Sequence, residues 1–239
     1  GLSGRGVTEG DDTMQTRTEK GGKNSEGPIG TGLVIERRFT TIGEDPFDQF
    51  DWIEMDVEIR NADGSLAHRI DDVRLPSGFS GVAGKVLAQK YLRKAGVPAI
   101  LRKVKEKGVP TWLQRSEPDH EKLQSLDPEK RFIGESHGRE LFRRLAGTWT
   151  YWGWKHGYFE AEADARAYFD EMCYLIASQR SAPNSPQWFN TGLHWAYGIE
   201  GPAQGHRYID PSTGELMTST NAYDCLLYTS PSPRDIVGS

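Results

Sequence analysis

Few side chains in this sequence are of types that do chemistry, and none of them forms a familiar catalytic motif. The two cysteines, Cys173 and Cys225, give neither a disulfide framework nor a Cys-x-x-Cys metal pair. His194 and His206 lie in a glycine-rich region that offers no obvious further ligands, so we expect no metal site there. The sequence has no Gly-rich phosphate loop, no His-Glu-x-x-His and no Gly-x-Ser-x-Gly. Motifs alone therefore predict no reaction and no catalytic residue.

The stretch from Ser181 to Gly192 is compositionally unusual, because two prolines and a glycine interrupt a run that also holds large aromatic residues. On residue types alone, Asn184-Ser185-Pro186 is most simply a turn or a helix cap. Trp188 and Phe189 follow it, and we expect both to be buried.

Composition is typical of a globular protein in a reducing cytoplasm. The 239 residues are 26% charged and 36% hydrophobic, enough for one sizeable core or two small ones. No apolar run reaches about 18 residues, so we expect no membrane span, and no secretory signal is evident. A net charge of −5 argues against a nucleic-acid binder. The first residue is not Met, so completeness is not assumed.

The first ordered part of the chain is expected to be β-structure. Residues 34–39 predict a short strand, and residues 52–59 alternate apolar and charged side chains, as a half-buried strand does. Asn61-Ala-Asp-Gly64 predicts a hairpin turn before a return strand over 66–75, which Pro76 stops.

Helical spacing of apolar residues follows. It predicts helices over about 82–91, 119–126, 135–157 and 160–176, with a loop-rich stretch between 98 and 135. In the last helix Ala165, Phe169, Met172 and Ile176 should be buried, and Cys173 should be a small buried hydrophobe rather than a reactive thiol. The aromatic block at Trp149, Tyr151, Trp152 and Trp154 has helical spacing, which favours core over base stacking.

Residues 207–217 predict a small hairpin that turns at Pro211 to Gly214. Residues 1–32 are nearly free of large apolar side chains and are expected to be a disordered tail. The class expected from the residues is α+β, mainly α-helical with a small β-hairpin region.

Three segments resemble the amino-terminal region of cobalamin-dependent (class II) ribonucleotide reductases. They are Ile35-Glu-Arg-Arg-Phe-Thr-Thr41 with Asp45-Pro46, Leu145-Ala-Gly-Thr-Trp-Thr-Tyr-Trp-Gly-Trp154, and Ala182-Pro-Asn-Ser-Pro-Gln-Trp-Phe-Asn-Thr-Gly-Leu-His-Trp-Ala-Tyr-Gly198. Their order and spacing also match, and the resemblance runs from about Leu33 to Asp224. It implies that residues 33–224 are the largely helical leading domain of a protein with a ten-stranded α/β barrel, reaching at most the first edge of that barrel.

Members of this family are oxidoreductases that make deoxyribonucleotides for DNA synthesis by thiyl-radical chemistry. The resemblance implies adenosylcobalamin as cofactor, a ribonucleotide, typically a diphosphate, as substrate, and a thioredoxin-like reductant. It also implies that Ser185, with Asn184 beside it, touches the phosphate end of the substrate. The physics is reasonable, because a hydroxyl and backbone N–H groups in a tight turn can converge on an oxyanion, while Pro186 fixes the turn.

The end of the chain departs from the family pattern. Asp224 is followed by Cys-Leu-Leu-Tyr-Thr-Ser-Pro-Ser-Pro-Arg, so Cys225 is not taken for the catalytic thiol, and residues 225–239 are expected to be a non-native tail. The catalytic cysteines and the cobalamin contacts would then lie outside this chain, which should be inactive alone. Two alternatives stay open: the large subunit of an iron-dependent (class I) reductase, and a non-catalytic helical interaction module.

Overall fold

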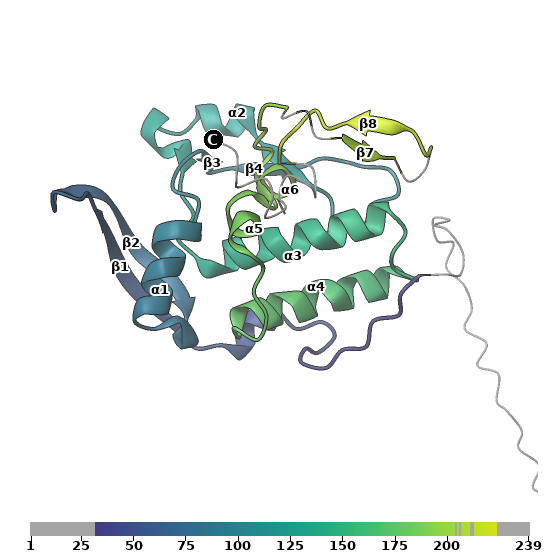
Figure 1. Ribbon diagram of the computed structural model, residues 1–239, viewed down its shortest axis with the longest axis horizontal. Coiled ribbons are helices and arrows are strands. Elements are labelled where there is room, and N and C mark those ends of the chain that lie inside the picture. Colours follow the sequence, from purple (N-terminus) through teal and green to yellow (C-terminus); the bar gives the residue numbers. More distant parts are fainter. Residues whose placement is uncertain (1–31, 204, 206, 211–212, 224–239) are drawn as a thin grey trace, which may run out of the picture.

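The computed structural model describes residues 32–203, 205, 207–210 and 213–223. Two long helices, α3 (Gly138–Lys155) and α4 (Glu162–Ala177), lie one above the other across the middle of Figure 1. A β-hairpin with a short helix in front of it stands at one end of this pair, and a second, smaller hairpin lies at the other end. The predicted α+β class is confirmed, whereas the barrel expected to follow this domain stays a prediction.

The first hairpin forms as its alternating pattern predicts. Strands β1 (Trp52–Arg60) and β2 (Leu66–Pro76) pair antiparallel, from Trp52 opposite Pro76 to Arg60 opposite Leu66. The Gly64 N–H donates to the Asn61 carbonyl at 2.9 Å, and Gly64 has a φ of +83°, which a residue with a Cβ rarely adopts. A 3₁₀ turn, η1 (Pro46–Gln49), precedes the hairpin, and another, η2 (Ser77–Phe79), follows it.

The predicted helix over 82–91 is confirmed, with a change of pitch inside it. It starts as α1 (Val82–Val86) and widens into one π-helical turn, η3 (Leu87–Tyr91), which the Leu92 N–H closes by donating to the Leu87 carbonyl at 3.2 Å. Leu87 and Ala88 face the core. This turn matters for the site described below, because it places Tyr91 at the end of the helix.

The residues before α3 form a capping box. The His137 Nδ1 accepts from the Arg139 N–H at 3.1 Å, while the Glu140 carboxylate accepts from the Ser136 and His137 N–H groups at 3.0 Å. The helix therefore begins at Gly138, slightly later than the predicted start. Its apolar stripe is buried as predicted at Leu141, Phe142, Leu145, Ala146 and Thr148.

Helix α4 is also present as predicted, but its buried face is different. Ala165, Cys173 and Ile176 are buried as expected, whereas Phe169 and Met172 are only partly buried. Asp170 and Glu171 are buried instead, although both are acidic. The reason lies in the extended segment that crosses this helix.

That segment covers residues 33–40, and the strand predicted within it, over residues 34–39, is wrong. Only Leu33 makes a β-bridge, to Phe159. The backbone donors of the segment pair with carboxylates of α4 rather than with a neighbouring strand: the Ile35 N–H donates to Asp164, and the Arg38, Phe39 and Thr40 N–H groups donate to Glu171. Asp170 in turn pairs with the Arg37 guanidinium at 2.8 Å.

Residues 97–135 were predicted to be loop with one short helix. The helix is confirmed as α2 (His120–Gln124), capped by Asp119. The pattern missed two very short strand pairs, β3 (Val97–Pro98) with β6 (Phe132–Ile133) and β4 (Leu101–Lys103) with β5 (Ser116–Pro118), and a 3₁₀ turn, η4 (Pro128–Lys130). Strands of two or three residues are too short to give a period, and prolines stand within two of them.

The chain continues through two short helices, α5 (Ser185–Asn190) and α6 (Leu193–Tyr197), to the predicted second hairpin. That hairpin is confirmed as β7 (Arg207–Ile209) paired with β8 (Leu216–Thr218), although Pro211 in its turn is outside the described residues. The predicted tails, residues 1–32 and 225–239, fall outside the described residues except for Gly32.

Besides a small cluster of Val97, Leu193 and Tyr197, two apolar clusters hold the described part of the domain together. The larger one joins the hairpin, η3, α3 and α4, and Trp188 of α5 belongs to it. The second consists of Val109, Leu113 and Tyr151, with Trp112, Trp152, Trp154 and Trp195 packed against them. Of the aromatic block predicted to be core, only Tyr151 is buried; Trp152 and Trp154 are partly buried against this cluster, and Trp149 is partly buried against the larger one.

Candidate functional site

The two residues predicted to contact substrate lie next to each other on an open surface. Asn184 is the residue before α5, and Ser185 is its first residue; both side chains are exposed. The Ser185 hydroxyl lies 3.0 Å from the Tyr91 hydroxyl, at the end of η3. The Asn184 side chain makes no capping bond, although the Asn184 carbonyl accepts from the Gln187 N–H at 3.1 Å. Both predicted groups are therefore available at the surface, and Ser185 is oriented by a neighbouring element.

Trp188 fixes the conformation of this turn from below. Its side chain is buried, and the indole N–H reaches back to the Pro183 carbonyl at 3.0 Å. Its ring stacks on Tyr91 with 5.4 Å between centroids. Phe189 was also predicted to be buried, but 43% of it is exposed, so that prediction is wrong; the ring lies against Tyr91 from the outside at 5.2 Å. Helix α5 packs against the core with one face only. Trp188 lies on that face, and the adjacent Phe189 points away from it.

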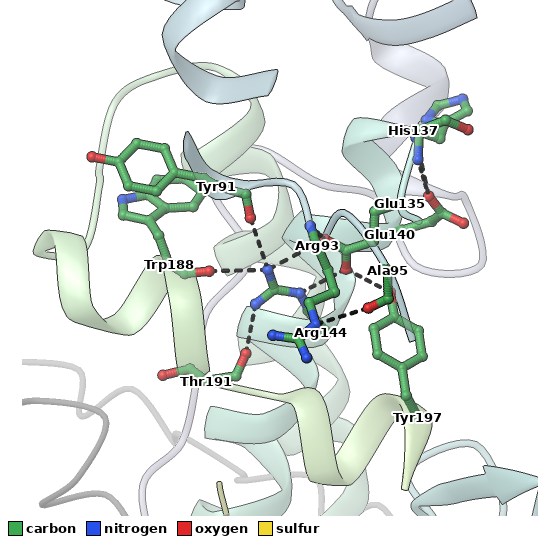
Figure 2. A network of polar contacts seen from close by, with 11 residues as sticks. Tyr91, Arg93, Ala95, Glu135, His137, Glu140, Arg144, Trp188, Thr191 and Tyr197 are labelled. Atoms are coloured by element: carbon green, nitrogen blue, oxygen red, sulfur yellow. Dashed lines mark hydrogen bonds and ion pairs between the residues drawn. The ribbon is translucent and has the colours of Figure 1, made fainter. Parts of the chain in front are cut away.

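A buried arginine joins α3 to both elements of the site (Figure 2). The Arg144 guanidinium is 1% exposed and donates to the carbonyls of Trp188 at 2.9 Å, Thr191 at 2.7 Å and Tyr91 at 3.2 Å. Two of these carbonyls come from α5 and the residue after it, and one comes from the end of η3. One side chain therefore sets the distance between the Ser185 turn and the Tyr91 turn.

Glu135 balances this buried charge. Its carboxylate accepts from the Arg144 Nε at 2.7 Å, from the Tyr197 hydroxyl at 2.6 Å and from the Arg93 backbone N–H at 2.8 Å (Figure 2). Burial, together with the negative charge of Glu135, raises the pKa of Tyr197 well above its usual value. Tyr197 thus stays a neutral hydrogen-bond donor at any physiological pH. Glu135 and Arg144 are joined by charge-assisted hydrogen bonds in a position with little access of water.

Sequence reasoning missed this network, although one signal was present. Arg144 lies three positions after Leu141 and directly before Leu145, so helical spacing places it beside the apolar stripe, where a charge indicates a buried partner. Nothing in the sequence identified Glu135 or Tyr197 as that partner, because the three residues come together only through the packing of α6 against α3.

Other candidates have structural roles. Cys173 is fully buried, and burial raises the pKa of its thiol well above the usual value, so its predicted role as a small hydrophobe is confirmed. Among the described residues, no group of three or more His, Cys, Asp or Glu side chains is placed to hold a metal ion. His194 lies on α6, and His206 is outside the described residues. No described helix has both the length and the apolar character needed to cross a membrane.

A surface cavity of about 620 Å³ contains neither predicted site residue. It lies between η1 and α4, and its charged lining is balanced: Arg37, Arg143 and Arg166 face Glu44, Asp45 and Glu162. Arg166 also pairs with Asp170, and Arg143 pairs with Asp45. We therefore take the Ser185 turn, rather than this cavity, as the candidate site.

Comparison with known proteins finds a family model and several curated relatives that share one description. The family model described as class II vitamin B12-dependent ribonucleotide reductase matches residues 54–179. The chain is 55% identical over 192 residues to the vitamin B12-dependent ribonucleotide reductase of Bradyrhizobium diazoefficiens and 54% identical to that of Agrobacterium fabrum, covering 80% of this chain in both cases. A more distant relative with the same name, from Rhodopirellula baltica, is 26% identical over 171 residues, 71% of this chain.

This chain belongs to the class II vitamin B12-dependent ribonucleotide reductase family. Neither the class I large subunit nor an unrelated interaction module is favoured by these findings. The chain spans 15% of the length of the Bradyrhizobium and Agrobacterium relatives and 13% of the Rhodopirellula relative.

Proposed function

We propose that residues 33–224 are the amino-terminal domain of a ribonucleoside-diphosphate reductase that uses adenosylcobalamin and a thioredoxin-like reductant in the cytoplasm. In this proposal the domain supplies a substrate contact, and the radical chemistry takes place on residues outside this chain. Family membership supports the reductase activity, since the curated relatives carry that name. The chain alone is then inactive.

Among the residues that the structure describes, neither of the two cavities given above and below suits a cobalamin. The linings of the two described cavities contain no histidine and no cysteine, and both cavities are open to the surface. A corrinoid needs a deep, shaped cavity, because the protein must orient the cofactor and exclude water from it. We therefore assign the cofactor site to parts of the reductase outside this chain and derive no step through it.

The observation that carries the proposal is the exposed Ser185 hydroxyl on a turn that is fixed from three sides. Tyr91 holds the hydroxyl, Trp188 holds the Pro183 carbonyl, and Arg144 holds the end of α5. Because the turn is already fixed, less conformational entropy is lost when a ligand binds to it. A substrate contact benefits from such a preorganised position. The Asn184 amide next to it is free to donate to the same ligand.

Substitution of Ser185 in the full-length reductase tests this contact. A hydrogen bond to a charged phosphate contributes about 1.5–3 kcal/mol, so Ser185→Ala should raise the KM for the ribonucleotide about tenfold or more. Ser181→Ala is the matched control, because Ser181 is an exposed serine of the same segment and makes no side-chain hydrogen bond to a described residue. An unchanged KM and kcat in Ser185→Ala would remove Ser185 from the site.

A further inference from the structure

A second cavity, of about 360 Å³, opens beside the Ser185 turn and carries only positive charge. Its wall is formed by the chain that leaves η3 and by the outer face of α5. The lining consists of Lys90, Tyr91, Leu92, Arg93, Lys94, Ala95, Phe189 and Asn190. It contains three cations and no carboxylate, whereas the cavity between η1 and α4 balances three arginines with three acids.

These three cations are not neutralised elsewhere. In the part of the chain that the structure describes, Lys90, Arg93 and Lys94 make no ion pair, while the arginines of the other cavity all do. Arg93 donates through Nε to the Ala95 carbonyl at 3.0 Å, and its terminal nitrogens make no hydrogen bond to a described residue. Cations without a carboxylate partner among the described residues raise the local positive potential, which favours an anion in the cavity.

The end of the helix explains only part of this cluster. A cation in the last turn of a helix interacts favourably with the unpaired carbonyl groups there, and Lys90 is in that position. Arg93 and Lys94 come after the helix has ended at Tyr91. Their gathering around a cavity therefore needs another reason.

The cavity shares a wall with the proposed substrate contact. The Tyr91 ring lines the cavity, and its hydroxyl touches the Ser185 hydroxyl at 3.0 Å. The buried network holds the same wall, because Arg144 binds the Tyr91 carbonyl and Glu135 binds the Arg93 N–H (Figure 2). A ligand that reaches Ser185 with one phosphate can thus place the next phosphate among the three cations.

We propose that this cavity binds the terminal phosphate of the diphosphate group whose nearer phosphate contacts Ser185. The inference rests on the proposed function of Ser185 and extends it to Lys90, Arg93 and Lys94. Charge complementarity supports a diphosphate, because such a group carries about three negative charges at neutral pH, the terminal phosphate having its second pKa near 6. Phe189 and Leu92 are the large apolar residues of the lining.

The test is a charge-removing double variant, Lys90→Gln with Lys94→Gln, in the full-length reductase. Both lysines are exposed, so the fold should tolerate the change. Lys85→Gln is the control: it removes an exposed lysine of α1 that makes no ion pair with a described residue and does not line the cavity. Exposed charge contacts are each worth a few-fold in affinity, so the double variant should raise the KM for a ribonucleoside diphosphate about tenfold. The inhibition constant of the matching ribonucleoside, which has no phosphate, should not change.

The outcomes separate this inference from the function on which it rests. If Ser185→Ala raises the KM and the lysine variant does not, the cavity is no phosphate site while the Ser185 contact stands. If neither variant changes the KM, both proposals fall. If the lysine variant alters only the response to a second, regulatory nucleotide, the cavity binds an effector and the inference is overturned.

Discussion

Replacement of Arg144 by methionine tests how the site is held in place. The substitution keeps a long, unbranched side chain in the buried position but removes every donor. The carbonyls of Tyr91, Trp188 and Thr191 then lose their partner, and the Glu135 carboxylate keeps only the Tyr197 hydroxyl and the Arg93 N–H. Removing one member of a buried ion pair typically costs about 3–5 kcal/mol, because the other charge is left without compensation.

Amide hydrogen exchange measures this cost locally, which is necessary because a large multidomain reductase does not unfold in one step. The Arg93 N–H, which donates to Glu135, reports on the network directly. A loss of about 3–5 kcal/mol should speed its exchange by roughly two to four orders of magnitude. Amides of α4 away from the network should keep their protection.

Arg143→Met is the control. Arg143 is the neighbouring residue on α3, but its side chain is 49% exposed and pairs with Asp45 at the surface. Its loss should cost about 1 kcal/mol or less. If exchange at Arg93 changed by no more in Arg144→Met than in Arg143→Met, Arg144 would not be what holds the two turns together. If Glu135→Gln restored protection in Arg144→Met, the damage would be confirmed as the uncompensated carboxylate.

Two further predictions concern the packing around this site. Burial raises the pKa of Glu171, but the Thr40 hydroxyl and the N–H groups of Phe39, Arg38 and Thr40 together outweigh it and lower that pKa below its usual value. The hydrogen bonds from residues 38–40 to Glu171 should thus stabilise the fold above about pH 4.3, the pKa of Glu in the unfolded state, and should be lost as the pH falls through the lower pKa of the folded state. Amide exchange at Phe39 and Thr40, corrected for intrinsic rates, should show this loss in the wild type. In Glu171→Gln these amides should exchange faster near pH 7 and respond little to acid. A pH-independent wild-type segment would contradict this role. Gly147→Ala should speed amide hydrogen exchange in α6, because the new Cβ would lie 2.1 Å from the Trp195 ring and such overpacking costs about 1–3 kcal/mol. Gly78→Ala, whose Cβ would meet only the end of the Gln179 side chain, should not change it. Equal exchange rates of α6 in the two variants would contradict tight packing of α3 against α6.

Periodicity predicted the parts of the fold in which one face meets the core. The hairpin, the two long helices and the small second hairpin are all local patterns of apolar and polar residues, with turns at Gly64 and caps near their ends. The same reasoning failed at residues 34–39, because an apolar, extended sequence does not reveal that its partners are the carboxylates of a helix. It also failed for Phe189, whose helix is too short for a pattern to tell the inner face from the outer one.

The site could be predicted only in part for a related reason. Ser185 and Asn184 were identified by resemblance, and their place on an exposed, rigid turn agrees with a binding role without testing it. Glu135, Arg144 and Tyr197 lie at separate points of the chain, and their shared burial depends on tertiary packing. The cationic cavity is different again, since Lys90, Arg93 and Lys94 are close in sequence but were indistinguishable from any solvated charged segment.

The most direct test of the account is the nucleotide reductase activity of the full-length protein with and without adenosylcobalamin. Reduction of a ribonucleoside diphosphate that requires adenosylcobalamin, and that no iron-containing partner subunit can support in its place, is the result predicted here. Activity that depends on a partner subunit and not on adenosylcobalamin, or no reduction of any ribonucleotide, would contradict it.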